Sequence, residues 1–185
     1  MHRQPLLQLI ETYSARYPEE QEMTSRLRDF VNQYPDCFER SQQVGHITGS
    51  CWLVDTSWDC VLLTHHRKLD IWVQLGGHAD GVTDVLEASM TEAEEESGLK
   101  QIRVVEAELF DVDIHEIPAR KSEPAHYHYD CRFLLQAVGS DEVIISDESH
   151  DLKWVPISEL EAYTTETSIM RMRDKYLRFR ETNQL

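Results

Sequence analysis

Three glutamates lie close together in the sequence: Glu92, Glu95 and Glu96. In a helix these positions are related as i, i+3 and i+4, so the three side chains meet on one face. Like charges this close repel one another unless a cation joins them, and hard divalent cations such as Mg²⁺ take carboxylate oxygens as ligands. A solvated helix face is the simpler interpretation, because Glu is a good helix former and runs of charge are usually exposed.

The residues on either side of the glutamates predict the helix that would carry them. Asp84 is suited to cap its N-terminus, and Glu87 three residues later completes a capping box. Gly98 is suited to end the helix, and the glycine pair 76–77 is expected to form a turn ahead of it. Apolar side chains at helical spacing are expected to face the core: Leu86, Met90 and Ala93.

The same stretch resembles the motif of the Nudix family, G-x5-E-x7-R-E-U-x-E-E-x-G-U, in which U is an aliphatic residue. Gly77 matches the first glycine, Glu92 matches the Glu of the Arg-Glu pair, Glu95 and Glu96 match the Glu-Glu pair, and Gly98 matches the last glycine. The resemblance implies hydrolysis of a diphosphate linkage in a nucleoside diphosphate derivative or a related small molecule. It also implies Mg²⁺ or Mn²⁺ as the cofactor.

The resemblance further implies roles for individual residues. The metal ligands would be the three glutamates Glu92, Glu95 and Glu96, together with the carbonyl of Gly77. The general base varies within the family and can be a glutamate of the motif, here Glu92 or Glu95, or an acid from a later loop. Glu148 is the candidate in that loop, for which an ordinary solvated turn is the alternative.

Two positions depart from the motif. Thr83 stands where the family has its first Glu, and Thr91 stands where it has Arg. In the family the Arg helps to hold the glutamates in place. A second hypothesis therefore stays open, in which the chain has a Nudix fold and binds a nucleotide or metabolite without hydrolysing it.

A third hypothesis is an enzyme similar to isopentenyl diphosphate isomerase, which shares the fold and binds its metal partly through histidines. His78 falls where that enzyme has a histidine ligand next to its catalytic cysteine. This chain has the glycine pair 76–77 ahead of His78 and no cysteine there, so the acid for the proton transfer would be missing.

Histidine is frequent, with nine residues in the chain. Along a strand, His126, His128 and Asp130 would point to one face. They could bind a second metal ion or a substrate phosphate, with Arg120 close by, and His78 is a further candidate for substrate binding. The alternative is that each histidine by itself is structural or faces solvent.

The composition bounds the class of protein. With 185 residues and 41% hydrophobic content, the chain suits one domain with an extension, which we expect to be a helical extension at 1–40 and a Nudix domain at 41–185. The net charge of -16 argues against binding to nucleic acid or anionic membranes. No apolar run reaches the roughly 18 residues of a membrane span, so we expect a cytoplasmic protein with a small-molecule partner. A homodimer is expected only by analogy with the family.

Hydrophobic periodicity predicts the remaining elements. Two amphipathic helices are expected within 4–34, and a short helix capped by Ser158 is expected before a final amphipathic helix. The expected strands are 44–54, 60–66, 71–75, 127–138 and 152–156, and the segment 102–117 is expected to be β-rich, with an alternating strand at 110–115. This order predicts an α+β protein with a mixed β-sheet flanked by helices, as an α/β/α sandwich. The four cysteines are scattered, and we expect them to be reduced and partly buried.

Overall fold

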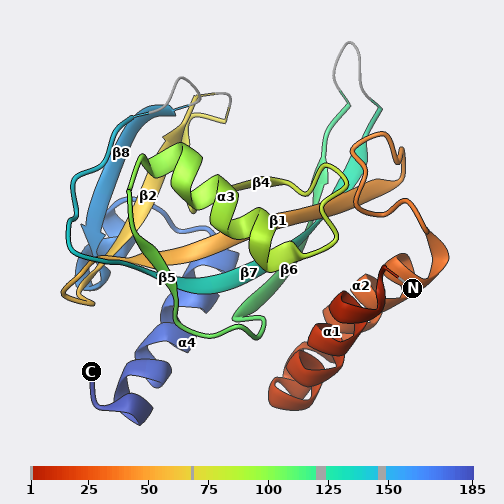
Figure 1. Ribbon diagram of the computed structural model, residues 1–185, viewed down its shortest axis with the longest axis horizontal. Helices are drawn as coiled ribbons and strands as arrows, with labels where there is room; N and C mark the ends of the chain where they lie inside the picture. The colour runs from red at the N-terminus through yellow and green to blue at the C-terminus, as the bar shows by residue number, and fades with distance from the viewer. Residues whose placement is uncertain (1, 68, 120–123, 146–148) are drawn as a thin grey trace. The chain divides into compact units, whose positions relative to one another are not determined.

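The computed structural model describes residues 2–67, 69–119, 124–145 and 149–185. Figure 1 shows the helices and strands in chain order. The helices are α1 (Gln4–Arg16), α2 (Gln21–Gln33), α3 (Val85–Ser97) and α4 (Thr167–Asn183). The strands are β1 (Gly45–Val54), β2 (Cys60–His66), β3 (Ile71–Val73), β4 (Gly76–His78), β5 (Ile102–Val104), β6 (Asp111–Ile117), β7 (His126–Ala137) and β8 (Ser149–Pro156). Most of the expected helices and strands are present, and β4 is an additional strand that the sequence did not predict.

The chain divides into two compact units, each assembled from three stretches. Unit 1 comprises Met1–Ser50, Gly77–Ser89 and Ala107–Phe133. Unit 2 comprises Cys51–Gly76, Met90–Glu106 and Leu134–Leu185. Four elements, β1, β4, α3 and β7, begin in one unit and end in the other along the chain.

In unit 1 the two N-terminal helices pack against each other, and α2 also contacts β6. Both helices bury a stripe at helical spacing, formed by Leu6, Ile10 and Tyr13 on α1 and by Leu27, Phe30 and Val31 on α2. Phe30 stacks on Tyr129 of β7 with ring centroids 3.9 Å apart. The predicted pair of amphipathic helices is therefore confirmed, and apolar and aromatic side chains attach α2 to the strands of unit 1.

A buried ion-pair network joins three strands of unit 1. β6 and β7 are antiparallel neighbours, with Asp111 opposite Arg132. The buried Arg132 guanidinium donates hydrogen bonds to Asp130 at 2.7 Å and to Asp111 at 3.1 Å. Asp130 also accepts hydrogen bonds from the hydroxyls of Thr48 (2.8 Å) and Ser50 (2.6 Å) on β1. Burial disfavours the charge of Arg132, but the surrounding carboxylates outweigh it and raise the pKa of the guanidinium.

The first turns of α3 lie directly on β1. A Cβ atom on Gly49 would come within 2.8 Å of the Ser89 nitrogen and 3.1 Å of the Val85 oxygen, so only glycine fits there. The Ser89 hydroxyl donates a hydrogen bond to the Ser50 carbonyl oxygen at 2.7 Å. The backbones of strand and helix therefore meet without a large side chain between them.

Unit 2 is built around β2, which pairs antiparallel with the end of β1, with β3 and with β8. The end of β7 pairs antiparallel with β5. Helix α4 packs here through Tyr176, whose ring centroid lies 6.0 Å from that of the buried Trp52. The Tyr176 hydroxyl donates a hydrogen bond to the Trp58 carbonyl oxygen at 2.7 Å.

Three local predictions were wrong. Of the three residues of α3 expected to face the core, Ala93 is buried as predicted, but Leu86 and Met90 are only half-buried, because α3 approaches β1 so closely that small residues such as Ala88 occupy the contact. The glycine pair 76–77 lies in β4, and the turn comes later, at Gly81 with φ 86°. The segment after β8 is a 3-10 helix, Ile157–Ala162, which follows Pro156 and has no side-chain cap.

The four cysteines are free thiols, as expected. Cys37, Cys51 and Cys131 are buried and Cys60 is half-buried. In the part of the chain that the structure describes, no helix has the length and apolar character needed to cross a membrane.

Candidate functional site

Helix α3 begins and ends where the sequence predicts. The Asp84 carboxylate accepts hydrogen bonds from the backbone N–H groups of Leu86 (3.1 Å) and Glu87 (3.3 Å), which is the geometry of an N-cap. At the other end Gly98 adopts φ 67°, and its N–H donates to the Glu94 carbonyl oxygen at 2.9 Å. Glycine adopts this left-handed conformation without strain, so the helix stops there.

The three glutamates lie in unit 2, on the last turns of α3, and differ in exposure. Glu95 is exposed, Glu92 is half-buried, and Glu96 is 9% exposed. The Glu96 carboxylate accepts a hydrogen bond from the Gly76 backbone N–H at 3.2 Å. This bond connects the start of β4 to the helix and fixes one carboxylate, while Glu95 is open to solvent.

This donor set fits a hard divalent cation. Carboxylates at positions i, i+3 and i+4 supply several oxygen ligands from one helix face, which is what Mg²⁺ and Mn²⁺ prefer. Glu92, Glu95 and Glu96 would hold the ion, with Glu96 pre-oriented by Gly76. The adjacent residue, Gly77, lies in β4, and its carbonyl stays a predicted ligand.

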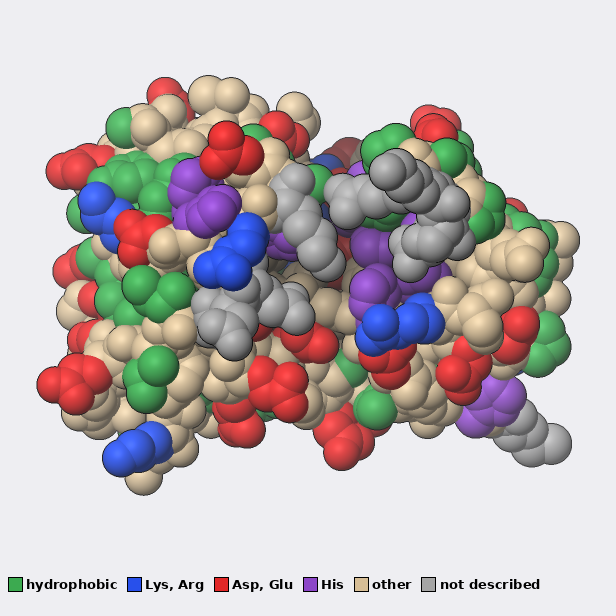
Figure 2. All heavy atoms as spheres, turned by 90° about the horizontal axis from the view of Figure 1, so that it is seen from above, with side chains coloured by type: hydrophobic (Ala, Val, Ile, Leu, Met, Phe, Trp, Pro, Cys, Tyr) green, Lys and Arg blue, Asp and Glu red, His purple; other side chains and the backbone are tan. Residues whose placement is uncertain are grey.

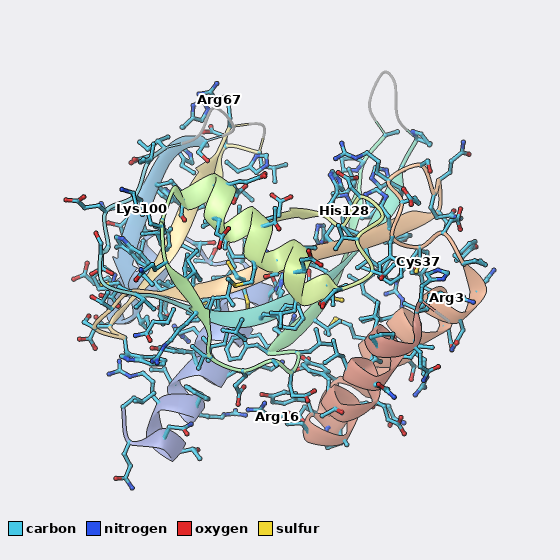
Figure 3. All side chains as sticks on the ribbon, in the orientation of Figure 1. Arg3, Arg16, Cys37, Arg67, Lys100 and His128 are labelled. Carbon is cyan, nitrogen blue, oxygen red and sulfur yellow. The ribbon has the colours of Figure 1, made fainter. Side chains whose placement is uncertain are left out.

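A second group of side chains, in unit 1, consists of histidines. Ring centroids lie 4.8 Å apart for His46 and His78, 4.8 Å for His46 and His128, and 5.1 Å for His78 and His128. His126 lies 5.0 Å from His46, and His115 lies 5.4 Å from His128. We call these five residues the histidine cluster. Figure 2 shows histidine side chains gathered at the surface, and Figure 3 labels His128 on β7.

Burial acts strongly on two members of the cluster. Burial, followed by the neighbouring imidazoles of His78 and His126, lowers the pKa of His46 to about 4. Burial, followed by four neighbouring imidazoles, lowers the pKa of His128 to about 2. Both rings are therefore neutral at pH 7, and each has one nitrogen lone pair available.

Asp130 has different neighbours from those of the two histidines that precede it on β7. Its carboxylate is 2% exposed and accepts the hydrogen bonds of Arg132, Thr48 and Ser50 described above. His126 and His128 belong to the histidine cluster. His126, His128 and Asp130 were expected to share one face of the strand, but Asp130 has different partners from the two histidines. Substrate binding by Asp130 stays a prediction.

The comparison with protein families decides the identity of the domain. The model of the NUDIX domain matches residues 46–174. The chain belongs to the Nudix family. The predicted resemblance is therefore confirmed, as is the fold class, a Nudix fold with a mixed sheet flanked by helices.

Several solved structures resemble the chain along most of their own length. A NUDIX-family hydrolase from Clostridium perfringens is 27% identical, with a TM-score of 0.54 over 71% of this chain and 95% of that one. An Ap4A hydrolase from C. elegans is 18% identical, with a TM-score of 0.54 over 72% and 96%. The dihydroneopterin triphosphate pyrophosphohydrolase of E. coli is 15% identical, with a TM-score of 0.53 over 72% and 93%. The comparison with curated protein sequences gives no significant match.

The two departures from the Nudix motif differ in location. Thr91 is exposed on α3, one residue before Glu92. Thr83 is half-buried in unit 1, where it borders a hollow together with Pro5 and Leu9 of the N-terminal segment. A larger residue at position 91 would therefore meet solvent, whereas position 83 is partly enclosed.

Two predicted site residues lie outside the described residues: Arg120 and Glu148. Their roles in substrate binding and as general base stay predictions.

His46 and His115 were missed as members of a site. Each stands alone in its own segment of the sequence, and strand pairing brings them next to His128, which faces His115 across β6 and β7. The alternation of side chains along β1 could have indicated the position of His46, because it places His46 on the same face of the strand as Thr48 and Ser50.

Proposed function

We propose that this Nudix protein hydrolyses a diphosphate linkage in a nucleoside diphosphate derivative or a related small molecule, with Mg²⁺ or Mn²⁺ as cofactor. The observation that supports the proposal is the cluster of three glutamate carboxylates on α3. Glu92, Glu95 and Glu96 share one helix face, and the Gly76 N–H holds Glu96 in place. Like charges at this spacing repel one another, and a bound divalent cation would offset that repulsion.

The reaction adds water across a P–O–P bridge and gives two products that each carry a phosphate group. A bound divalent ion neutralises diphosphate oxygens and lowers the pKa of a coordinated water. The protein must then provide a base for the water proton. Glu95, which is exposed, and Glu92, which is half-buried, are the described candidates, and Glu148 of the later loop is the third.

The alternative of binding without hydrolysis rests on Thr91. In place of the family arginine, the exposed threonine offers no cation to orient the glutamates. A protein that only binds would keep its affinity for a nucleotide when Glu95 is replaced, whereas a hydrolase would lose turnover. The cytoplasmic location and the homodimer stay predictions from the sequence.

The test is a phosphate-release screen on the whole protein with Mg²⁺ or Mn²⁺. The panel contains nucleotide sugars, ADP-ribose, nucleoside triphosphates, coenzyme A and dinucleotide polyphosphates, the last in view of the Ap4A hydrolase among the similar structures. Glu95→Gln is the test variant. Glu94→Gln is the matched control, because Glu94 is exposed on the same helix and occupies a position of the motif at which any residue is allowed. We expect turnover by wild type and Glu94→Gln that chelator abolishes, and a loss of about 100-fold or more in Glu95→Gln. Absence of turnover in every protein of the set would contradict the proposal.

A further inference from the structure

We infer that the histidine cluster of unit 1 binds a transition-metal ion of the zinc class through His46, His78 and His128. The site is independent of the glutamates on α3, because all of its ligands lie in unit 1 and are imidazoles. Imidazole nitrogen suits Zn²⁺, Ni²⁺ and Co²⁺, whereas carboxylate oxygen suits Mg²⁺ and Mn²⁺. The two sites would therefore select different metals.

Geometry is the first argument. The three side chains come from β1, β4 and β7, and one nitrogen from each lies within 4.8 Å of the others. Tetrahedral Zn²⁺ with Zn–N bonds of about 2.0–2.1 Å requires ligand nitrogens about 3.3–3.4 Å apart. The distances between the ligand nitrogens thus need to shorten by at most about 1.5 Å, a movement within reach of small χ1 and χ2 rotations.

The surroundings of His46 supply an independent argument. His46 is 3% exposed, and neither of its ring nitrogens makes a hydrogen bond of good geometry among the described residues, although the Gln42 backbone is close enough to act on its pKa. A buried polar group without a partner costs about 1–3 kcal/mol, so such groups are rare in native proteins. A metal ion bound between His46, His78 and His128 would satisfy one of these nitrogens.

The protonation state of the cluster agrees with this assignment. Because burial and the neighbouring rings lower the pKa of both His46 and His128, these imidazoles are neutral and ready to act as ligands at pH 7. The groups facing them are mostly other imidazoles, and Asp113 lies 3.2 Å from His115 at the edge of the cluster. Among the described residues, Arg40 borders the same pocket as His46 and is ion-paired with Asp80.

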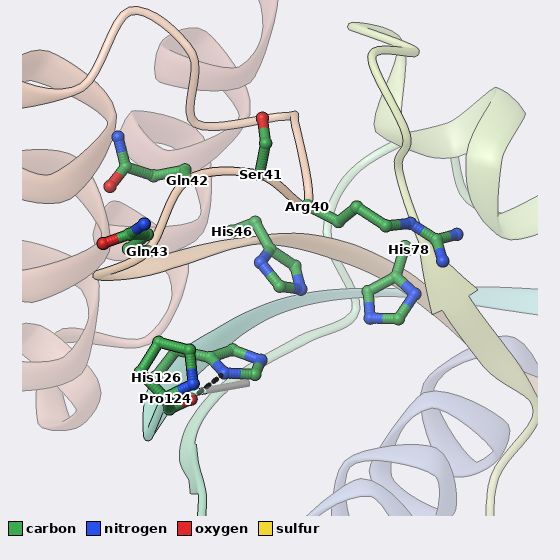
Figure 4. A pocket seen from close by; sticks show the side chains of 8 residues that line it. All are labelled: Arg40, Ser41, Gln42, Gln43, His46, His78, Pro124 and His126. Carbon is green, nitrogen blue, oxygen red and sulfur yellow. Dashed lines mark hydrogen bonds between the residues drawn. The ribbon is translucent and has the colours of Figure 1, made fainter. Parts of the chain in front are cut away.

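A fourth coordination position is available on the side of a pocket of about 110 Å³. Figure 4 shows the imidazoles of His46, His78 and His126 around this pocket. The His126 Nδ1 lies 2.9 Å from the Pro124 carbonyl oxygen, to which only a protonated Nδ1 can donate. This hydrogen bond leaves the Nε2 lone pair of His126 free of a proton, which is the usual arrangement for a metal-ligating histidine. The fourth position is open to His126 or to a water from the pocket.

The test is metal titration of the full-length protein after treatment with EDTA. Zn²⁺ binding is measured by calorimetry, and Co²⁺ binding by the visible absorption of tetrahedral Co²⁺. The variants are His78→Gln and His128→Gln, and a thermal melt shows that each is folded. His150→Gln is the control histidine, since it is exposed in unit 2, and Glu95→Gln separates this site from the carboxylates on α3.

We expect one tightly bound Zn²⁺ per chain in wild type, His150→Gln and Glu95→Gln. Loss of an orienting partner of a metal ligand already weakens binding by about 10–100-fold, so loss of a ligand should weaken it at least about 100-fold in His78→Gln. The half-buried His78 gives the decisive variant if His128→Gln fails to fold. Equal Zn²⁺ affinity in wild type and His78→Gln, or loss of binding in Glu95→Gln alone, would overturn the inference.

Discussion

Replacement of Arg132 by methionine tests how the strands of unit 1 are held together. The guanidinium is 2% exposed and lies between Asp130 and Asp111. The network spans β1, β6 and β7, the strands that carry His46, His115 and His128. Methionine retains most of the length of the side chain and removes only the charge and the hydrogen-bond donors.

The expected loss follows from the contacts. Two hydrogen bonds between charged groups disappear, and each is worth about 1.5–3 kcal/mol. Two carboxylates stay buried without their counter-charge, and breaking a buried ion pair in this way costs about 3–5 kcal/mol. These two figures describe the same interaction, so they are not added. Because Thr48 and Ser50 still donate to Asp130, we expect about 4 kcal/mol.

The assay is urea unfolding at 25 °C and pH 7. With a slope of about 2 kcal/mol per molar urea, the midpoint should fall by about 2 M in Arg132→Met. Arg173→Met is the matched control, because Arg173 also makes two ion pairs, at 2.7 and 2.9 Å, but with the exposed side chains of Glu161 and Asp174. We expect the control to lose less than about 1 kcal/mol. A loss this small in Arg132→Met as well would refute the reasoning.

Further predictions concern two features: the packing and capping of α3, and the reactivity of the cysteine thiols. Gly49→Ala should lower the free energy of unfolding by about 1–3 kcal/mol, because the added Cβ meets the Ser89 backbone nitrogen; a melting temperature equal to that of wild type would contradict this. Asp84→Ala should cost about 1 kcal/mol through loss of the N-cap, measured by urea unfolding, and Asp84→Asn should restore most of it. Under native conditions at pH 8, iodoacetamide should label Cys60 first, because the other thiols are buried and burial raises the pKa of Cys37 to about 11. Peptide mass spectrometry that finds Cys37 labelled as fast as Cys60 would contradict this prediction.

Local patterns in the sequence were sufficient for most of the fold. The positions of α3, its cap at Asp84 and its end at Gly98 depend on side chains within a few residues of each other, so they are visible without tertiary information. The resemblance to the Nudix motif could also be recognised from the sequence, because the glutamates and glycines that carry it lie within one short stretch of the chain. The buried face of α3 was predicted only in part: Ala93 is buried, but Leu86 and Met90 are half-buried, because the close approach at Gly49 places small residues of the helix against β1.

The histidine cluster depends on pairings between distant segments. His46 and His128 are 82 residues apart in sequence, and nothing local to either indicates the other. Alternation correctly grouped His126 with His128, but it could not separate them from Asp130, whose partners on β1 are fixed only by the tertiary fold.

The proposed metal-dependent hydrolysis depends on the carboxylates on α3. It is tested by the initial rate on the best substrate of the screen, measured against Mg²⁺ concentration for wild type, Glu94→Gln and Glu95→Gln. We expect the same curve for wild type and Glu94→Gln, and at saturating Mg²⁺ a rate at least about 100-fold lower for Glu95→Gln. A Glu95→Gln curve that coincides with that of wild type would show that these carboxylates do not support the reaction.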